Sequence, residues 1–168
     1  IVTLKSQPVS VVSDLTGRTT ASLSAEVRPQ VSGIIQKRLF NEGDNVKAGQ
    51  ALYQIDPSSF RATYNEAAAA LKQAQALVVA DCQKAQRYAL LVKDNGVSRQ
   101  DADDAQSTCA QDKASVESKK AALESARINL NWTTVTAPIT GRIGISSVTP
   151  GALVTAEQTT ALATIRGL

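Results

Sequence analysis

The sequence predicts an α+β fold in which a β-sandwich is split by an inserted antiparallel pair of long helices. Two similar segments indicate the sandwich: residues 27–55 and 135–165 share glycines and apolar residues at a constant separation of 108 positions, as between Gly33 and Gly141. Each alternates apolar and polar residues between glycine-rich turns, a pattern typical of short strands. Between Pro57 and Pro138 there is no proline and a single glycine, which favours long helices.

The first predicted unit covers residues 1–24. The segment from Ile1 to about Thr20 has strand-like sequence, and we expect it to join a β-barrel whose other strands lie outside this sequence. Because the chain begins and ends abruptly, we interpret it as a piece of a longer protein.

The sandwich is expected from residues 25–56 and 133–168. Gly43 and Gly151 keep the separation of 108, and Leu52 and Leu162 match after a slip of two residues. Neither half can bury both of its faces alone. We therefore expect one domain with pseudo-twofold symmetry, closed by segments that are distant in sequence.

Residues 57–132 are expected to form the helical hairpin. Asp56-Pro57 favours a helix start, with Asp as the N-cap and Pro at the first helical position. Asp94-Asn95-Gly96 favours a stop and turn, and Ser98 is the natural N-cap of a second helix. The helices should span about Ser58 to Lys93 and Arg99 to Asn131, each roughly 50 Å long at the α-helical rise. Trp132 is expected to pack where the second helix re-enters the sandwich.

Apolar residues in both helices recur in alternating steps of three and four, the spacing of a two-stranded coiled coil. An antiparallel register in which paired residue numbers add up to 190 matches the two seams and centres the turn at position 95. This register pairs Phe60 with Leu130, Val78 with Asp112, Ala85 with Ala105 and Tyr88 with Ala102. Alanine dominates the seam and Asp81, Asp112 and Lys119 interrupt it, so we expect a slender hairpin of modest stability.

The two cysteines lie almost opposite each other in this register, since the numbers of Cys82 and Cys109 add up to 191. A disulfide is the favoured reading and would indicate an oxidising compartment. It would add roughly 3 kcal/mol by the chain-entropy estimate. Two reduced, buried cysteines that act as small core residues remain the alternative.

The composition and motifs argue against several classes of function. The net charge of +3 is small and dispersed, so nucleic acid is not an expected partner. Histidine is absent and there are two cysteines, so no metal site is expected. No nucleophile elbow, phosphate-binding loop or dinucleotide fingerprint occurs, and we expect neither catalytic residues nor a cofactor. No stretch is long and apolar enough for a membrane span.

Longer motifs carry a family resemblance. The segment Gly33–Leu52, with its Glu-Gly-Asp turn and Val-x-x-Gly-x-x-Leu run, resembles the first half of a biotinyl/lipoyl carrier domain. The place of the modified lysine instead reads Asp56-Pro57-Ser58-Ser59 and opens the helical insert. A split lipoyl-like domain around a hairpin resembles the periplasmic adaptors, or membrane fusion proteins, of resistance-nodulation-division (RND) efflux pumps of the AcrA/MexA type. The matching runs are AEVRPQVSGII, LYQIDPSSF, ESARINL, APITGRIG and GALVTAEQTTALATI.

The resemblance implies an adaptor without chemistry of its own. Such a protein links an inner-membrane RND drug transporter to an outer-membrane channel. The hairpin tip meets the channel, and the lipoyl-like domains pack into a ring, commonly of six copies. It also implies a periplasmic location, with anchoring to the inner membrane by a lipid or an N-terminal segment absent from this chain.

The family carries an Arg-x3-Leu-x6-Ser signature at the tip that contacts the channel, and Arg87, Leu91 and Ser98 match it. Arg87 and Leu91 are four residues apart and share a helix face, and Ser98 lies across the turn. Local roles are the alternative: Ser98 as a helix cap, Leu91 in packing and Arg87 as a solvated charge.

Two other readings remain. An adaptor of a type I secretion or macrolide-type transporter shares the split architecture, although hairpin length and the tip signature favour the RND type. A carrier domain of a multienzyme complex would need a lysine at Asp56-Pro57 and no hairpin.

Overall fold

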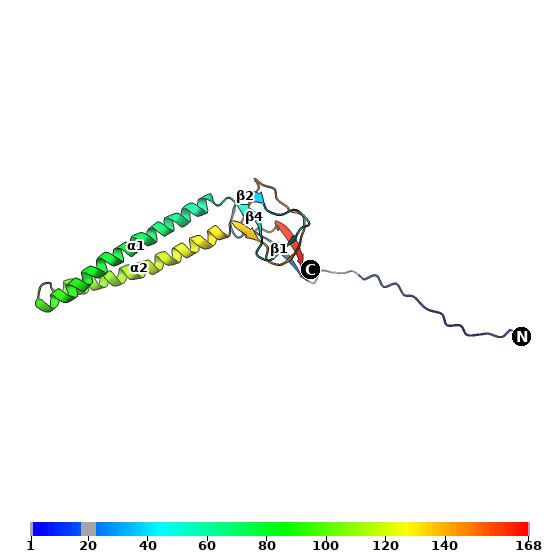
Figure 1. Ribbon diagram of the computed structural model, residues 1–168, viewed down its shortest axis with the longest axis horizontal. Coiled ribbons are helices and arrows are strands. Elements are labelled where there is room, and N and C mark those ends of the chain that lie inside the picture. Colours follow the sequence, from blue (N-terminus) through cyan, green and yellow to red (C-terminus); the bar gives the residue numbers. More distant parts are fainter. Residues whose placement is uncertain (1, 18–22, 168) are drawn as a thin grey trace.

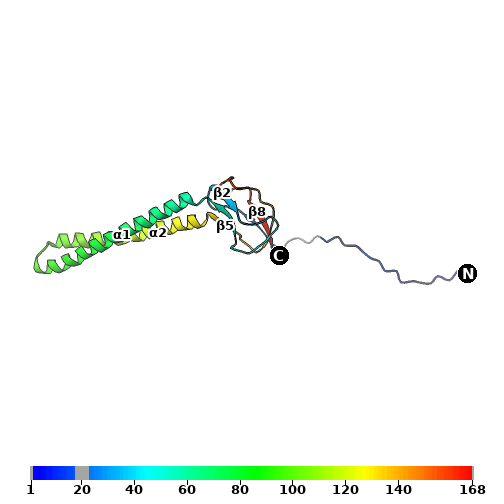
Figure 2. The same cartoon turned by 45° about the horizontal axis from the view of Figure 1, so that its top comes forward.

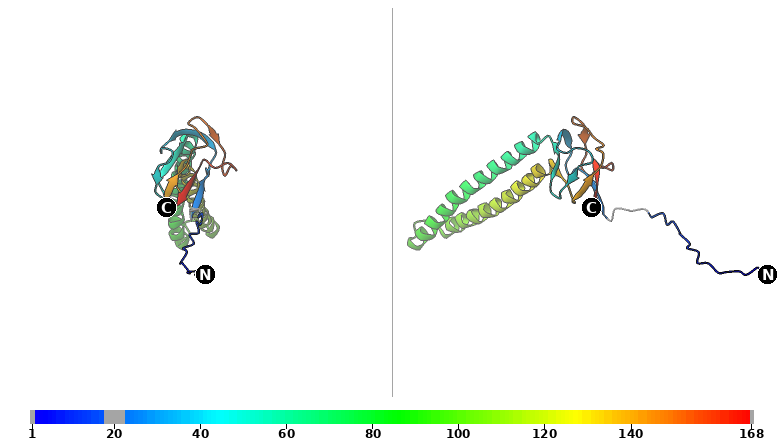
Figure 3. Two further views of the ribbon diagram at one scale, coloured as in Figure 1. Left: turned by 90° about the vertical axis from the view of Figure 1, so that its right-hand side faces the viewer. Right: turned by 45° about the vertical axis from the view of Figure 1, so that its right-hand side comes forward.

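The chain forms an elongated molecule, described here from a computed structural model that covers residues 2–17 and 23–167. A small β-sandwich carries a long helical hairpin on one side (Figures 1 and 2). Seen along the long axis, the hairpin lies behind the sandwich (Figure 3, left). The elements in chain order are β1 (Ser24–Val27), β2 (Gly33–Arg38), β3 (Asn45–Val46), β4 (Ala51–Ile55), α1 (Ser58–Leu91), η1 (Val92–Asp94), α2 (Arg99–Asn131), β5 (Thr134–Thr136), β6 (Gly141–Ile143), β7 (Leu153–Val154) and β8 (Ala163–Gly167).

Both sheets combine strands from the two sequence-distant halves. One has the order β1-β8-β6-β3 and the other β5-β4-β2-β7. The internal repeat is visible in the strand register: Gly33 pairs with Val154 in β2–β7, and the equivalent residues Gly141 and Val46 pair in β6–β3. The predicted sandwich split by a helical insert is therefore confirmed.

Two equivalent glycine pairs explain why the repeat retains glycine. Gly43 and Gly151 adopt φ values of 87° and 94°, in the left-handed region that favours glycine. At Gly33 and Gly141 a Cβ atom would lie 2.6 Å from Ile55 Cγ2 and 2.1 Å from the Arg166 carbonyl oxygen. The strands can therefore approach each other only where a side chain is absent.

The core lies between the sheets and draws on both halves. Leu52, Tyr53 and Ile55 from β4 pack in one cluster with Leu162 and Ile165 from the C-terminal segment. The Tyr53 hydroxyl lies 2.6 Å from Ser146 Oγ and donates to the Leu162 carbonyl oxygen at 3.1 Å. Burial raises the pKa of this phenol, so the hydroxyl stays protonated and available as a donor.

The N-terminal segment differs from the prediction. Residues 2–17 contain no strand, and their large apolar side chains, such as Leu4 and Val11, are exposed. A strand needs a partner for its backbone N–H and C=O groups, and the described part of the chain offers this segment none. Part of the predicted strand region, residues 1 and 18–22, lies outside the described residues. The β-barrel assignment stays a prediction.

The hairpin ends almost where the sequence indicates. Helix α2 has the predicted bounds, and α1 ends at Leu91 with a short 3-10 turn, η1, that continues to Asp94. At the start of α1, Pro57 rather than Asp56 occupies the N-cap position. The Asp56 carboxylate still accepts hydrogen bonds from the Ser58 N–H at 3.0 Å and the Ser58 hydroxyl at 2.7 Å, which lowers its pKa.

Packing along the hairpin is thin. The buried side chains of α1 and α2 are small: Ala74, Ala85, Ala105, Cys109 and Ala126. Ala85 and Ala105 share a cluster, as the predicted register requires. The structure adds a contact that this register lacks, because Asp112 faces Asp81, one turn nearer the tip than Val78.

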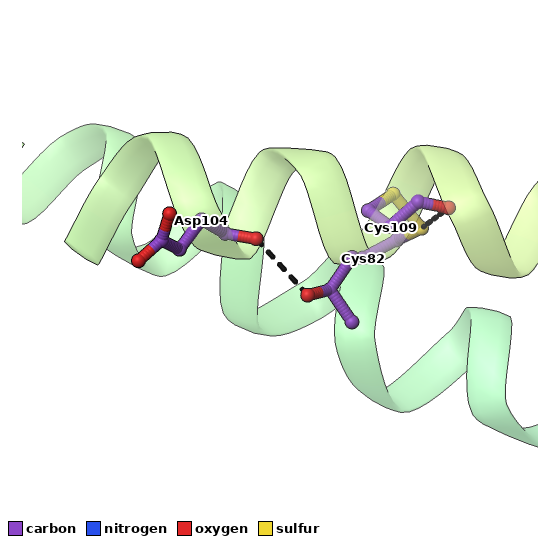
Figure 4. The surroundings of a disulfide bond; sticks show 4 residues. Cys82, Asp104 and Cys109 are labelled. Atoms are coloured by element: carbon purple, nitrogen blue, oxygen red, sulfur yellow. Dashed lines mark hydrogen bonds between the residues drawn. A yellow bond between two sulfur atoms is a disulfide. The ribbon is translucent and has the colours of Figure 1, made fainter. Parts of the chain in front are cut away.

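Cys82 and Cys109 form a disulfide across the hairpin, with their Cα atoms 4.7 Å apart (Figure 4). The predicted pairing is therefore present, and the alternative of two reduced cysteines is not observed. Beside it, the Thr108 hydroxyl donates to the Asp104 carbonyl oxygen at 3.0 Å. The disulfide ties together two helices that bury few large side chains at this level.

Candidate functional site

The candidate site is the hairpin tip, where α1 turns into α2. Asn95 takes the left-handed conformation with φ 59°, which reverses the chain after η1. The Gly96 N–H donates to the Leu91 carbonyl oxygen at 2.9 Å and closes the end of the first helix. The predicted turn is therefore correct, with Asn95 rather than Gly96 in the left-handed position.

Ser98 begins the second helix as predicted. Its Oγ accepts a hydrogen bond from the Asp101 N–H at 3.0 Å, which satisfies one of the free amides at the helix start. Ser98 is also exposed. Its capping role and a contact with a partner are therefore compatible only if the partner approaches without displacing this hydrogen bond.

Arg87 and Leu91 project from the last two turns of α1. They are four residues apart, so they share one face of the helix. Both side chains are exposed, and Leu91 keeps 44% of its surface accessible. The described residues include no ion-pair partner for Arg87. Together with Ser98, these residues present a cation, an apolar side chain and a hydroxyl at the tip.

Leu90 is a further exposed apolar residue that the sequence reasoning missed. It is 65% exposed, more than its neighbour Leu91. Its position off the seam, two residues beyond Tyr88, was the signal that could have identified it. Two adjacent exposed leucines give the tip a larger apolar surface than the three-residue signature alone.

The sandwich carries no lysine where a carrier domain holds its modified lysine. Where a modified lysine would lie, Asp56 and Ser58 form the hydrogen bonds that start α1. Among the described residues, no group of three or more acidic, Cys or His side chains could hold a metal ion. None of the helices in the described part of the chain is apolar over a length that would cross a membrane.

The prediction for Trp132 is wrong in part. The residue ends α2 beside the sandwich, as expected, but its side chain is 42% exposed. It borders a hollow of about 330 Å³ that is also lined by Val27 and Pro138. The anchoring role falls instead to Phe60, which packs against the sandwich core from the first turn of α1.

Comparison with known proteins gives a consistent result. Residues 23–166 match the family described as RND MFP, barrel-sandwich hybrid domain. The whole chain is 49% identical to the multidrug efflux pump subunit AcrA of Escherichia coli (strain K12) and 52% identical to the multidrug resistance protein MexA of Pseudomonas aeruginosa. It spans 42% and 40% of the lengths of these two relatives.

A solved structure agrees with the fold. The crystal structure of a MacA-MexA chimeric protein, which contains the Pseudomonas aeruginosa MexA α-hairpin domain, superposes with a TM-score of 0.55 at 37% identity. The match covers 88% of this chain and 49% of the chimera. The similarity therefore extends over both the sandwich and the hairpin of this chain.

Proposed function

Because this chain belongs to the RND membrane fusion protein family, whose members are the periplasmic adaptors of RND efflux pumps, we propose that it links an inner-membrane RND transporter to an outer-membrane channel. The sandwich is the base, and the hairpin is the arm that reaches the channel. The alternative of a type I secretion or macrolide-type adaptor is not favoured, because the family match is specific to the RND group.

The observation that carries this proposal is the exposed tip. The end of the disulfide-linked hairpin that lies away from the sandwich carries Arg87, Leu91 and Ser98. Leu90 extends the apolar surface beside them. A partner helix that meets this end gains an ionic contact with Arg87 and apolar contacts with the leucines. The chemistry fits an α-helical partner surface with an acidic or carbonyl acceptor.

Site-specific crosslinking in cells tests the proposal. A photoreactive residue at position 91 is expected to capture the outer-membrane channel, and one at Lys72, an exposed position in the middle of α1, serves as the matched control. Capture of the channel from position 72 and not from position 91 contradicts docking by the tip.

Self-association is a further part of the proposal, with the hexamer as the expected assembly. Ile34 and Leu153 face each other across β2 and β7 and remain 43% and 71% exposed. The repeat places Arg142 and Asn45 at the equivalent pair in β6 and β3. One of the two repeat-related strand pairs thus exposes an apolar pair, and the other does not. A head-to-tail contact between copies joins two different surfaces, so an apolar patch on one side only suits this kind of contact.

Replacement of Leu153 by Asp is expected to shift the protein toward smaller species in sedimentation experiments. Asn45→Asp introduces the same charge at the equivalent position and is the matched control. An unchanged distribution with Leu153→Asp contradicts the proposed contact.

For localisation we propose the periplasm, with the inner-membrane anchor supplied by a lipid or an N-terminal segment. The disulfide supports an oxidising compartment. Thiol quantification on denatured, unreduced protein from the periplasm is expected to find no free thiol. Two free thiols would contradict the proposal of an oxidised hairpin.

A further inference from the structure

Two carboxylates meet inside the hairpin seam. Asp81 on α1 and Asp112 on α2 are both half-buried. The Oδ2 atom of Asp112 is fully enclosed, and it accepts no hydrogen bond from any donor in the described part of the chain. The polar group within hydrogen-bonding reach is the Asp81 carboxyl. A buried oxygen with an acid as its neighbour calls for a physical explanation.

No cation neutralises the pair among the described residues. Towards the tip, Asp81 borders a hollow shared with Lys84, whose Nζ lies 5.3 Å from the centroid of the Tyr88 ring rather than in an ion pair with either Asp. Towards the base, neither Lys113 nor Lys119 forms an ion pair with either Asp. The other charged and titratable side chains that line the hollow at Asp81 are acidic or phenolic: Asp101, Asp104 and Tyr88. On α2 towards the base, Glu117 is a further acid.

The disulfide keeps the two acids together. Cys82 directly follows Asp81, and Cys109 lies one helical turn before Asp112. The cysteine Cα atoms are 4.7 Å apart, so the helices cannot move apart at this level (Figure 4). The carboxyl groups therefore remain neighbours whether or not they are ionised.

Two carboxylates held this closely repel each other when both are ionised, whereas one proton converts the contact into a carboxyl–carboxylate hydrogen bond. The pKa of Asp112 is accordingly raised, first by its hydrogen bond with Asp81, then by burial and by the negative charge of Asp81. A proton also gives the enclosed Oδ2 atom a role in a hydrogen bond.

We propose that Asp81 and Asp112 form a proton-binding site that makes the middle of the hairpin sensitive to pH. The folded hairpin binds the proton more tightly than the unfolded chain, because the two acids are neighbours only in the folded state. The stabilisation therefore builds up as the pH falls through the raised pKa, is fully present below the usual aspartate pKa, and is lost as the pH rises through the raised value. The hairpin stiffens as its surroundings become acidic.

Carboxyl-carbon NMR titration of the oxidised protein tests the site directly. The Asp112 carboxyl carbon is expected to titrate above the usual aspartate range. Asp81→Asn should remove this upward shift, because the neighbouring group is then an uncharged amide that can donate a hydrogen bond to the Asp112 carboxylate. Asp103→Asn changes an exposed acid on the same helix and should leave the Asp112 titration unchanged.

Amide hydrogen exchange provides the second readout. After correction for intrinsic exchange rates, protection of residues 78–85 and 105–116 should rise on acidification by about tenfold for each pKa unit of the upward shift. Asp112→Asn and, separately, Asp81→Asn should each abolish this dependence, and Asp103→Asn should retain it. Because either single replacement removes the pair, failure of one variant to fold leaves the other as the test. Titration of Asp112 in the usual aspartate range, or pH-dependent protection that survives both replacements, overturns the proposal.

Discussion

The sandwich and the hairpin are stabilised by different means. In the sandwich, large side chains such as Leu52, Tyr53 and Ile165 are completely buried between two sheets. In the hairpin, the buried side chains are four alanines and Cys109, which remove little apolar surface from water. A disulfide takes the place of a large apolar core.

Because of this difference, the stability of the sandwich does not depend on the length of the hairpin. The sandwich can tolerate changes at the hairpin tip, because Phe60, in the first turn of α1, is the one described residue of the hairpin that packs against the sandwich core. The hairpin can be long because it depends on local helix formation, end capping and one covalent link. Substitutions in the sandwich core should therefore lower the free energy of unfolding, whereas substitutions in the hairpin should change amide exchange in α1 and α2.

The largest effect is expected in the sandwich core. Leu52→Ala should lower the free energy of unfolding by about 2–5 kcal/mol, because it leaves a cavity among residues from both halves. Urea unfolding followed by the fluorescence of Trp132 measures it. Leu153→Ala, at an exposed strand position, should change stability by less than about 0.5 kcal/mol. Equal losses of unfolding free energy for the two variants would contradict the view that large buried side chains stabilise the sandwich.

Removal of the disulfide should affect the hairpin and spare the sandwich. Cys82→Ser combined with Cys109→Ser opens a link between residues 27 positions apart, which the chain-entropy estimate values at roughly 3 kcal/mol. Amide exchange should accelerate in α1 and α2 near the cysteines, while β4 and β8 keep their protection. Faster exchange throughout the sandwich would show that the two regions unfold as one unit.

Loss of the cap at the tip should have a smaller effect. Ser98→Ala removes the acceptor for the Asp101 N–H and should destabilise the start of α2 by about 1 kcal/mol. Exchange of the first-turn amides of α2 measures this loss. Ser115→Ala, at an exposed position inside the same helix, is the control and should show no such loss.

The smallest effect is a pH dependence at the base of α1. Hydrogen bonds from Ser58 lower the pKa of Asp56. Since the folded pKa is depressed, the stabilisation is present above the usual aspartate pKa and disappears as the pH falls through the lowered value. Exchange of the Ser58 amide, corrected for intrinsic rates, should accelerate in acid. The same acceleration in Asp56→Ala would assign it to another group.

Much of this architecture could be predicted from the sequence because the signals are local and repeated. Gly33 and Gly141 occupy places without room for a side chain, so the repeat preserves them. Helix α2 begins at Ser98 and ends at the predicted residue because capping chemistry and the following strand fix its limits. The cysteine pairing followed from the antiparallel register.

The remaining features depend on three-dimensional packing. Asp81 and Asp112 contact each other diagonally across the seam. A register that pairs each residue with a single partner assigns Asp112 to Val78 and therefore omits this contact. Trp132 remains partly exposed, whereas Phe60 packs against the sandwich core, and the spacing of neither residue in the sequence reveals this difference. Residues 2–17 have strand-like sequence but no partner strand among the described residues, and sequence pattern alone cannot supply one.

The most direct test of the proposed division between base and arm is Arg87→Asp, with Lys72→Asp as the control for charge reversal in the middle of α1. Drug resistance of cells that depend on this adaptor and the melting temperature of the purified protein are measured together, at matched expression. We predict lost resistance with an unchanged melting temperature for Arg87→Asp, because the side chain is exposed and forms no ion pair with any of the described residues. Full resistance with Arg87→Asp would contradict docking through the tip.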